Sequence, residues 1–164
     1  MGIFWEELTS GLFDVRQLLH ILIRLVAAVI LGGIIGFQRE RVGKPAGLRT
    51  HILVSLGTTV FVLGCLGSGM SSDGLSRVIQ GVVTGIGFLG AGSILKLNEE
   101  RDIQGLTTAA GIWMTAAIGV AVGLGSLGIA ILSTVFALVV LVLIIPLEEQ
   151  IKTRQIGKAR ERDE

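Results

Sequence analysis

The chain of 164 residues is poor in the residues that cover the surface of a soluble protein. Only 16% of its residues are charged, it has no tyrosine, and proline occurs twice. Residues 103–147 contain no charged side chain, and residues 50–72 contain no Asp, Glu, Lys or Arg. The single cysteine, Cys65, excludes a disulfide framework within one chain, and we expect it to be a small buried hydrophobe. These absences exclude an ordinary soluble domain, whose surface needs more charge.

Hydrophobic residues and glycine make up most of the chain in place of charged residues. Hydrophobic residues make up 51% of the chain, the mean hydropathy is +0.76, and glycine occurs 24 times. A membrane-spanning helix needs about 20 apolar residues, so the uncharged residues 103–147 hold two spans. We predict an all-α, polytopic membrane helix bundle with five transmembrane helices, at residues 17–37, 50–68, 77–96, 106–124 and 127–146. Residues 1–146 would form one transmembrane domain that ends at Pro146, and residues 147–164 a short charged cytoplasmic tail.

Lys and Arg predict the orientation of these helices. They gather in the first loop (Arg39, Arg41, Lys44, Arg49), in the third loop (Lys96, Arg101) and in the tail (Lys152, Arg154, Lys158, Arg160, Arg162). Because short cytoplasmic loops are rich in Lys and Arg, all three segments are expected to be cytoplasmic and the N-terminus to lie outside. The net charge of +1 hides this asymmetry and gives no indication of nucleic-acid binding.

The segment GVVTGIGFLGAG at residues 81–92 contains the spacing Gly85-x-Gly87-x-x-Gly90, which also occurs in dinucleotide-binding turns. Such a turn follows a strand, whereas this segment lies within an uncharged span, so we reject a cofactor site. Gly instead lets helix backbones touch in a bilayer, and the two small faces of this helix predict that it is central in the bundle. A break in the helix at Gly85–Gly92, as in transporters, stays open as an alternative. The glycines that we expect in helix packing are Gly32, Gly36, Gly81, Gly85, Gly87, Gly90, Gly92, Gly111 and Gly119.

Two further helices have small faces built from Gly, Ala and Thr. In residues 106–124, Thr108, Gly111, Thr115 and Gly119 share one face. In residues 17–37, one stripe contains His20, Arg24, Ala28, Gly32 and Gly36, so that its ionisable and small residues point toward protein. Thr107 and Thr108 can hydrogen-bond across helices or to their own backbone, and we favour the second reading.

Arg24 lies inside the first predicted span, where an arginine is costly and marks a functional site unless it snorkels to the headgroups. Both readings stay open. None of the five spans contains Asp or Glu, and Mg²⁺ prefers carboxylate oxygens or retained waters. This argues against a dedicated Mg²⁺ conductor, although a path lined by carbonyl oxygens is not excluded. We find no catalytic set of nucleophile and base, and therefore predict no enzyme, no cofactor and no metal site.

The first loop, RERVGKPAGLRTH at residues 39–51, combines four cations with a turn fixed by Pro45 and glycine. Ordinary positive-inside charge explains the cations, but it does not require this ordered string. A docking surface for a phosphate-bearing ligand or an acidic partner is the sharper hypothesis. The polar residues that we single out as candidate functional sites are Arg24, Arg39, Glu40, Lys44, Arg49, Thr50, Arg77, Thr107 and Thr108.

Three strings in the expected order resemble the MgtC/SapB family of bacterial inner-membrane proteins. They are RLVAAVILGGIIGFQRERVGKPAGLRTHILVSLG (24–57), RVIQGVVTGIGFLGAGSIL (77–95) and IQGLTTAAGIWMTAAIGVAVGLG (103–125). The resemblance implies a multi-pass inner-membrane protein whose relatives are linked to growth under Mg²⁺ limitation, acid tolerance and virulence, one of them acting on the F-type ATP synthase. Some relatives have a C-terminal soluble domain. The present sequence ends soon after the fifth predicted helix, so a role that depends on that domain is not expected here.

Two hypotheses about function follow. The first is a membrane regulator of ion or proton homeostasis that contacts other membrane complexes, such as a transporter or the F-type ATP synthase, through its helices and the cytoplasmic residues 39–49. The alternative is a transporter or channel, in which Arg24, Arg77 and the backbone of Gly85–Gly92 line a site. Besides the lipid bilayer, a second copy of the chain is a possible partner for the small faces.

Overall fold

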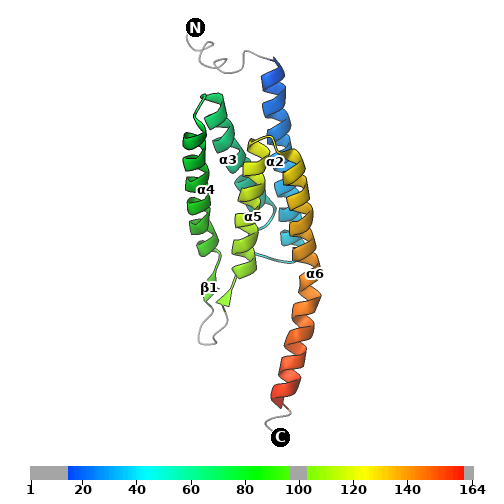
Figure 1. Cartoon of the computed structure of the whole chain (residues 1–164). Helices are drawn as coiled ribbons and strands as arrows, with labels where there is room; N and C mark the ends of the chain where they lie inside the picture. The colour runs from blue at the N-terminus through cyan, green and yellow to red at the C-terminus, as the bar shows by residue number, and fades with distance from the viewer. Residues whose placement is uncertain (1–14, 97–102, 161–164) are drawn as a thin grey trace.

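A computed structural model describes residues 15–96 and 103–160, with side chains described for residues 15–94 and 104–143. The described residues form five helices and one pair of two-residue strands (Figure 1). The helices are α2 (Val15–Arg41), α3 (Leu48–Gly67), α4 (Ser72–Gly92), α5 (Leu106–Gly123) and α6 (Leu127–Arg160). The strands β1 (Leu95–Lys96) and β2 (Ile103–Gln104) pair antiparallel. The predicted all-α membrane bundle is confirmed.

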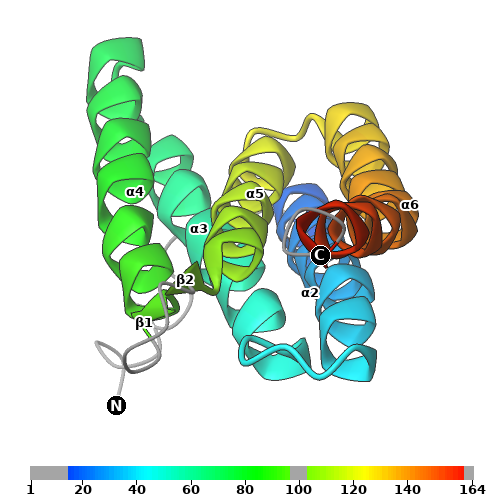
Figure 2. The same cartoon turned by 90° about the horizontal axis from the view of Figure 1, so that it is seen from below.

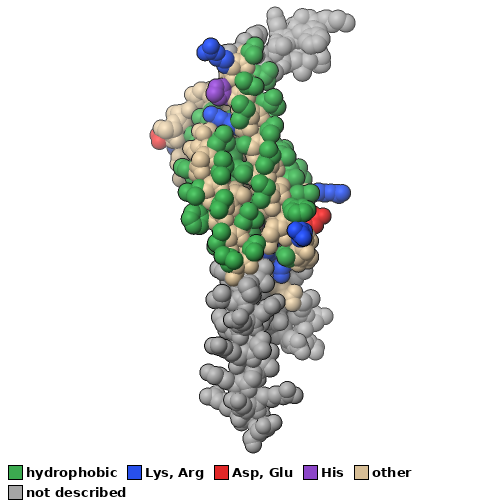
Figure 3. Space-filling model, turned by 90° about the vertical axis from the view of Figure 1, so that its right-hand side faces the viewer, with side chains coloured by type: hydrophobic (Ala, Val, Ile, Leu, Met, Phe, Trp, Pro, Cys, Tyr) green, Lys and Arg blue, Asp and Glu red, His purple; other side chains and the backbone are tan. Residues whose placement is uncertain are grey.

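Length and hydropathy qualify α2, α3, α4 and α5 as membrane spans. The described apolar part of α6, Leu127–Leu143, is shorter. Large hydrophobic side chains cover the outside of the bundle, and Lys and Arg lie toward the two ends of this hydrophobic surface in the face shown in Figure 3. The N-terminal end of α2 lies at the opposite end of the molecule from β1, β2 and the C-terminal end of α6 (Figure 1).

The ends of three helices differ from the predicted ones for local reasons. α2 continues to Arg41, because the turn that stops it comes at Gly43, whose φ is 67°. α4 begins at Ser72, where the Ser71 hydroxyl accepts a hydrogen bond from the Gly74 backbone at 3.3 Å. The prediction that Pro146 ends the last helix is wrong, since α6 continues to Arg160. One proline removes a single backbone hydrogen bond, and the bonds on either side of it keep the helix together.

The centre of the bundle is formed by α2, α3 and α5. Figure 2 places α5 between α4 and α6, and half of the α5 span is buried. α4 lies at the edge, contacts α5 and α3, and buries only Ile86 and Gly90 among its residues. The prediction that the 77–96 helix is central is therefore wrong for the single chain. The central helices α2, α3 and α5 pack their small faces against one another, and α4 packs beside them through the side that contains Ile86 and Gly90.

The small faces of α2 and α5 are the ones that pack within the chain. A Cβ atom placed on Gly32 would lie 2.7 Å from the carbonyl oxygen of His51, and one on Gly36 would lie 2.7 Å from the Cα atom of Leu48. A Cβ on Gly119 would collide with Thr58 and with the backbone of Ser55. Glycine is therefore needed where α3 crosses both neighbours, in agreement with the predicted packing role of these three residues.

The glycines of α4 behave differently. A Cβ placed on Gly81, Gly85, Gly87 or Gly92 would meet no atom within 4 Å outside its own stretch of helix, and one on Gly90 would make an ordinary contact with Ala109. α4 is also one unbroken helix from Ser72 to Gly92, so the alternative of a break at Gly85–Gly92 is not observed. The glycine face of α4 points away from the rest of the chain, and its predicted packing role is not fulfilled within one copy.

Candidate functional site

Five polar side chains meet inside the bundle, and we call them the polar core. Arg39 comes from α2, His51 and Ser55 from α3, and Thr108 and Thr115 from α5. None of them is more than 1% exposed. The helices place them there because His51 and Ser55 are one turn apart on α3, while Thr108 and Thr115 share the small face of α5.

Two hydrogen bonds connect the helices within the polar core. Arg39 Nη2 donates to Thr108 Oγ1 at 3.5 Å, and His51 Nδ1 lies 2.7 Å from Thr115 Oγ1. The Thr115 hydroxyl donates its single proton to the Gly111 carbonyl at 2.9 Å. The proton between His51 and Thr115 must therefore be on Nδ1, which makes His51 the donor and leaves its Nε2 atom as an acceptor when the ring is neutral.

Several buried polar atoms in and beside the polar core have no hydrogen-bond partner among the described residues. They are Arg39 Nε, His51 Nε2, Ser55 Oγ and Gln38 Oε1. Within the described part of the chain no carboxylate forms an ion pair with Arg39, so its positive charge is buried with one long hydrogen bond to Thr108. An unpaired buried charge is costly, and inside a membrane protein such a residue is a functional candidate.

Threonines on the same face of α3 join it to α5. Thr59 Oγ1 lies 2.8 Å from the carbonyl oxygens of both Ser55 and Gly119, and Thr58 Oγ1 donates to its own helix at Val54. The Gly119 contact crosses between the helices, whereas the others stay within α3. Thr59 therefore links α3 to α5, the two helices that bring His51 and Thr115 to hydrogen-bonding distance.

The predicted first loop divides into a buried part and an exposed part. The carboxylate of Glu40 accepts a hydrogen bond from the Leu48 backbone at 2.8 Å, which satisfies a free N–H at the start of α3 and makes the turn compact. Arg39 turns into the polar core, while Lys44 and Arg49 are exposed and Thr50 is half-buried. Within this segment Glu40 thus caps a helix, Arg39 belongs to the polar core, and Lys44 and Arg49 are surface cations.

Arg24 lies toward the other end of α2, and it does not extend freely toward the headgroups. Its Nη1 atom donates to the Gly123 carbonyl at 2.8 Å, at the C-terminal end of α5. The same side chain lines a polar cavity of about 460 Å³ together with Arg16 and His20. Arg77 is exposed on α4 and does not line this cavity. The structure therefore does not bring Arg24, Arg77 and the Gly85–Gly92 backbone together.

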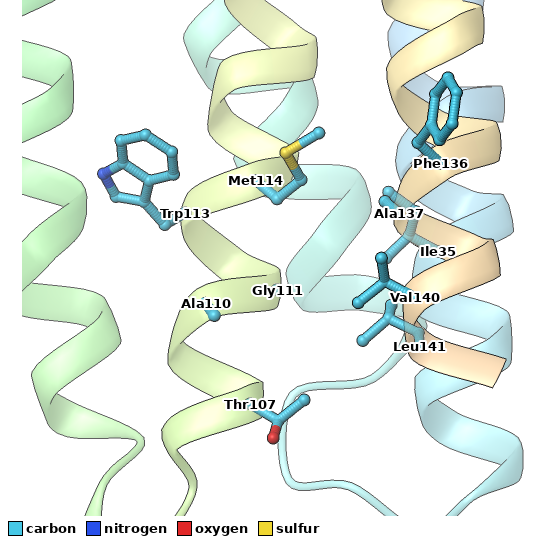
Figure 4. A pocket seen from close by; sticks show the side chains of 10 residues that line it. All are labelled: Ile35, Thr107, Ala110, Gly111, Trp113, Met114, Phe136, Ala137, Val140 and Leu141. Carbon is cyan, nitrogen blue, oxygen red and sulfur yellow. The ribbon is translucent and has the colours of Figure 1, made fainter. Parts of the chain in front are cut away.

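A second cavity, of about 360 Å³, lies between α5, α6 and α2 (Figure 4). Among its ten lining residues, only Thr107 and the indole of Trp113 carry a polar side-chain group, and Met114, Phe136 and Val140 are typical of the rest. An apolar cavity of this kind suits a hydrocarbon chain and offers no ligands to a hydrated ion. Thr107 is exposed there, whereas Thr108 accepts its hydrogen bond from Arg39 on another helix. Our preference for bonding within the helix is therefore wrong for Thr108.

Sequence reasoning did not select His51, Ser55 and Thr115 as site residues. The available signal was their spacing, because His51, Ser55, Thr58 and Thr59 follow one face of α3 and Thr115 lies on the small face of α5. This spacing predicts that the residues share one face of a helix, but it does not predict which other helix packs against that face. Among the described residues, no group of three His, Cys, Asp or Glu side chains is placed to hold a metal ion.

Comparison with known proteins identifies the family. The family model described as "MgtC family" matches residues 25–150, which include the whole of the polar core. The chain belongs to the MgtC family. The resemblance to this family is confirmed, and it supports the prediction of a membrane protein. The name of one relative, YhiD, refers to magnesium. No solved structure is significantly similar to the chain.

Three relatives illustrate the similarity to other MgtC family members. Protein SrpB of Synechococcus elongatus is 43% identical over 72% of this chain and 71% of its own length. The putative magnesium transporter YhiD of Escherichia coli is 46% identical over 73% of this chain and 58% of its own length. Protein MgtC of Brucella abortus is 45% identical over 80% of this chain and 54% of its own length. The chain thus spans little more than half the length of the last two relatives.

Proposed function

We propose that this chain is a regulatory protein of the bacterial inner membrane. In this proposal it adjusts ion or proton homeostasis, under Mg²⁺ limitation or acid stress, by contacting other membrane complexes and without catalysing a reaction. The observation in favour is the closed centre of the bundle. Ala28, Ile35, Val62, Ile118 and Val122 are no more than 1% exposed, and all of them except Val62 belong to one buried hydrophobic cluster. A transporter would need a hydrated or polar path through this region.

The surface of α4 is our candidate for the contact with a partner. Its glycine face is left open within the chain, and Phe88 on the same helix is 83% exposed. A helix with a small face lets a second helix approach closely in the bilayer. At the predicted cytoplasmic end, exposed Lys44 and Arg49 add positive charge that would favour an acidic partner.

Site-specific photo-crosslinking in native membranes tests this proposal. A photoreactive residue at Phe88 on α4 is expected to capture a reproducible partner protein, whereas the same residue at Ile129 on α6, which is 63% exposed, reports random lipid-side encounters. A product of twice the mass of the chain would identify a second copy as the partner. Equal labelling at the two positions would contradict a specific contact through α4.

Transport is the alternative function, and the name of YhiD as a putative magnesium transporter refers to it. Inside the bundle the described helices hold Arg24 and Arg39, whereas the carboxylates of α2 and α4, Glu40 and Asp73, are exposed near helix ends, so a transported solute would be anionic or neutral. Flux of ions and small solutes into proteoliposomes that contain only the pure protein separates the two functions. Flux that is abolished by Arg24→Ala would overturn the regulatory proposal, and silence of both proteins supports it.

A further inference from the structure

The cavity at the N-terminal end of α2 has a cationic side and an apolar side. Arg16, His20 and Arg24 follow one another at intervals of four residues, so all three lie on one face of α2, with Gln17 beside them. Leu63 and Leu66 form the opposite wall, at the end of α3. None of the eight described residues that line the cavity is acidic. The cavity therefore presents positive charge and hydrogen-bond donors next to a hydrocarbon surface.

The guanidinium of Arg24 is fixed in place before any ligand arrives. One of its nitrogens donates to the Gly123 carbonyl at 2.8 Å, and the group packs on the backbone of Gly125, where a Cβ atom would lie 2.5 Å from Arg24 Nη2. Gly125 has a φ of 82°, a conformation that other residues rarely adopt. Arg24 has five N–H groups in total, so donors beyond the one used for Gly123 are available to a ligand.

We propose that this cavity binds a phosphate group, presented either by the headgroup of an anionic phospholipid or by free inorganic phosphate. Phosphate oxygens accept several charge-assisted hydrogen bonds at once, and arginine presents its donors in a matching fork. His20 and Gln17 add donors around the same space. For a phospholipid, Leu63 and Leu66 offer an apolar wall to the start of the acyl chain. This ligand is independent of the regulatory function proposed above.

Lipid titration of the purified full-length protein, followed by native mass spectrometry, tests the lipid form of the ligand. Phosphatidylglycerol is compared with phosphatidylcholine, whose choline cation would face the arginines. We expect the protein to bind phosphatidylglycerol more tightly, and Arg24→Gln to weaken this binding about fivefold, since one cation near a lipid headgroup contributes about 1 kcal/mol. Arg77→Gln removes an exposed cation that does not line the cavity, and should change the binding less than twofold.

Two further measurements keep the test decisive. Because Arg24→Gln also removes the hydrogen bond to Gly123, Gln17→Glu serves as a second variant that places a negative charge in the cavity and leaves Arg24 untouched. The free-phosphate form is tested by the thermal stability of delipidated protein in sodium phosphate against sodium chloride at equal ionic strength.

The outcomes separate the two sources of phosphate and the failure of the proposal. Loss of phosphatidylglycerol selectivity in both cavity variants supports a lipid headgroup. A phosphate-specific stabilisation that both variants lose, without lipid selectivity, supports free phosphate. If neither ligand distinguishes the wild type from Arg24→Gln and Gln17→Glu, the cavity is not a phosphate site.

Discussion

We expect that replacing Arg39 by methionine stabilises the folded protein. Arg39 is 1% exposed, and among the described residues its Nε atom has no partner and its one side-chain hydrogen bond spans 3.5 Å to Thr108. Methionine has a similar length and flexibility, and it needs no hydrogen bond. A residue that lowers the stability of the fold is kept for another reason, so this substitution separates the structural from the functional role of Arg39.

The magnitude follows from two opposing effects. Loss of the Thr108 hydrogen bond costs about 0.5–1.5 kcal/mol, and less if the bond is as weak as its length indicates. Removal of the unpaired buried charge is favourable, since replacing buried ionic groups by apolar residues of similar volume often stabilises proteins by roughly 1–4 kcal/mol. We therefore expect the free energy of unfolding to rise by about 1–2 kcal/mol. Thr108→Val is the matched control, because it removes only the acceptor and should lower the stability by about 1 kcal/mol.

The assay is unfolding in mixed micelles by a denaturing detergent, followed by tryptophan fluorescence, to which Trp113 on α5 contributes. The double variant Arg39→Met with Thr108→Val should be no less stable than Arg39→Met alone, because threonine has then already lost its partner. A decrease of more than 1 kcal/mol in Arg39→Met would refute the reasoning, since it would mean that the charge of Arg39 is well compensated in the folded protein.

Three further predictions test the helix packing, the cap at the start of α3 and the hydrophobic core. Gly119→Ala should destabilise the bundle by about 1–3 kcal/mol because the new methyl group meets the α3 backbone. Gly85→Ala, with open space around it, should leave the stability equal or raise it by up to about 1 kcal/mol, and similar effects at the two sites in the unfolding assay would contradict the packing. Glu40→Ala should cost about 1 kcal/mol and speed hydrogen exchange at the start of α3, and unchanged exchange there would show that the carboxylate does not cap the helix. Ile118→Ala, at 1% exposure, should cost about 2–5 kcal/mol, while Ile131→Ala, at 54%, should stay within about 1 kcal/mol of wild type; the reverse order would place the core elsewhere.

Much of the fold was predictable because membrane spans are local features of the chain. An uncharged stretch of sufficient length must be helical in a bilayer, since its backbone polar groups have no water to bond with. The predicted spans therefore match α2 to α5 to within a few residues at most of their ends. The largest differences are the start of α4, which the Ser71 hydroxyl caps, and the continuation of α6 past Pro146, and hydropathy indicates neither.

The candidate site was predictable only in part. The small face of α5 was recognised from its spacing, and all four of its members are buried. The same argument applied to α4 gave a wrong position in the bundle, because its glycine face is as small as that of α5 but is not covered within the chain. Arg39 was assigned to a charged loop, yet the extra turn of α2 carries it into the interior.

By itself the sequence determined the class of the protein, the approximate bounds of the five described helices, and the membership of the MgtC family, since each of these depends on residues close together in the chain or on matched strings. The tertiary structure determined which small faces pack together. It also buried Arg39 and His51 against α5 and bonded Arg24 to the C-terminal end of α5. The physical reason is that several helices offer equally small faces. Only the long-range fit of α2 and α5 against α3 selects among them, and this selection determines which polar side chains are enclosed.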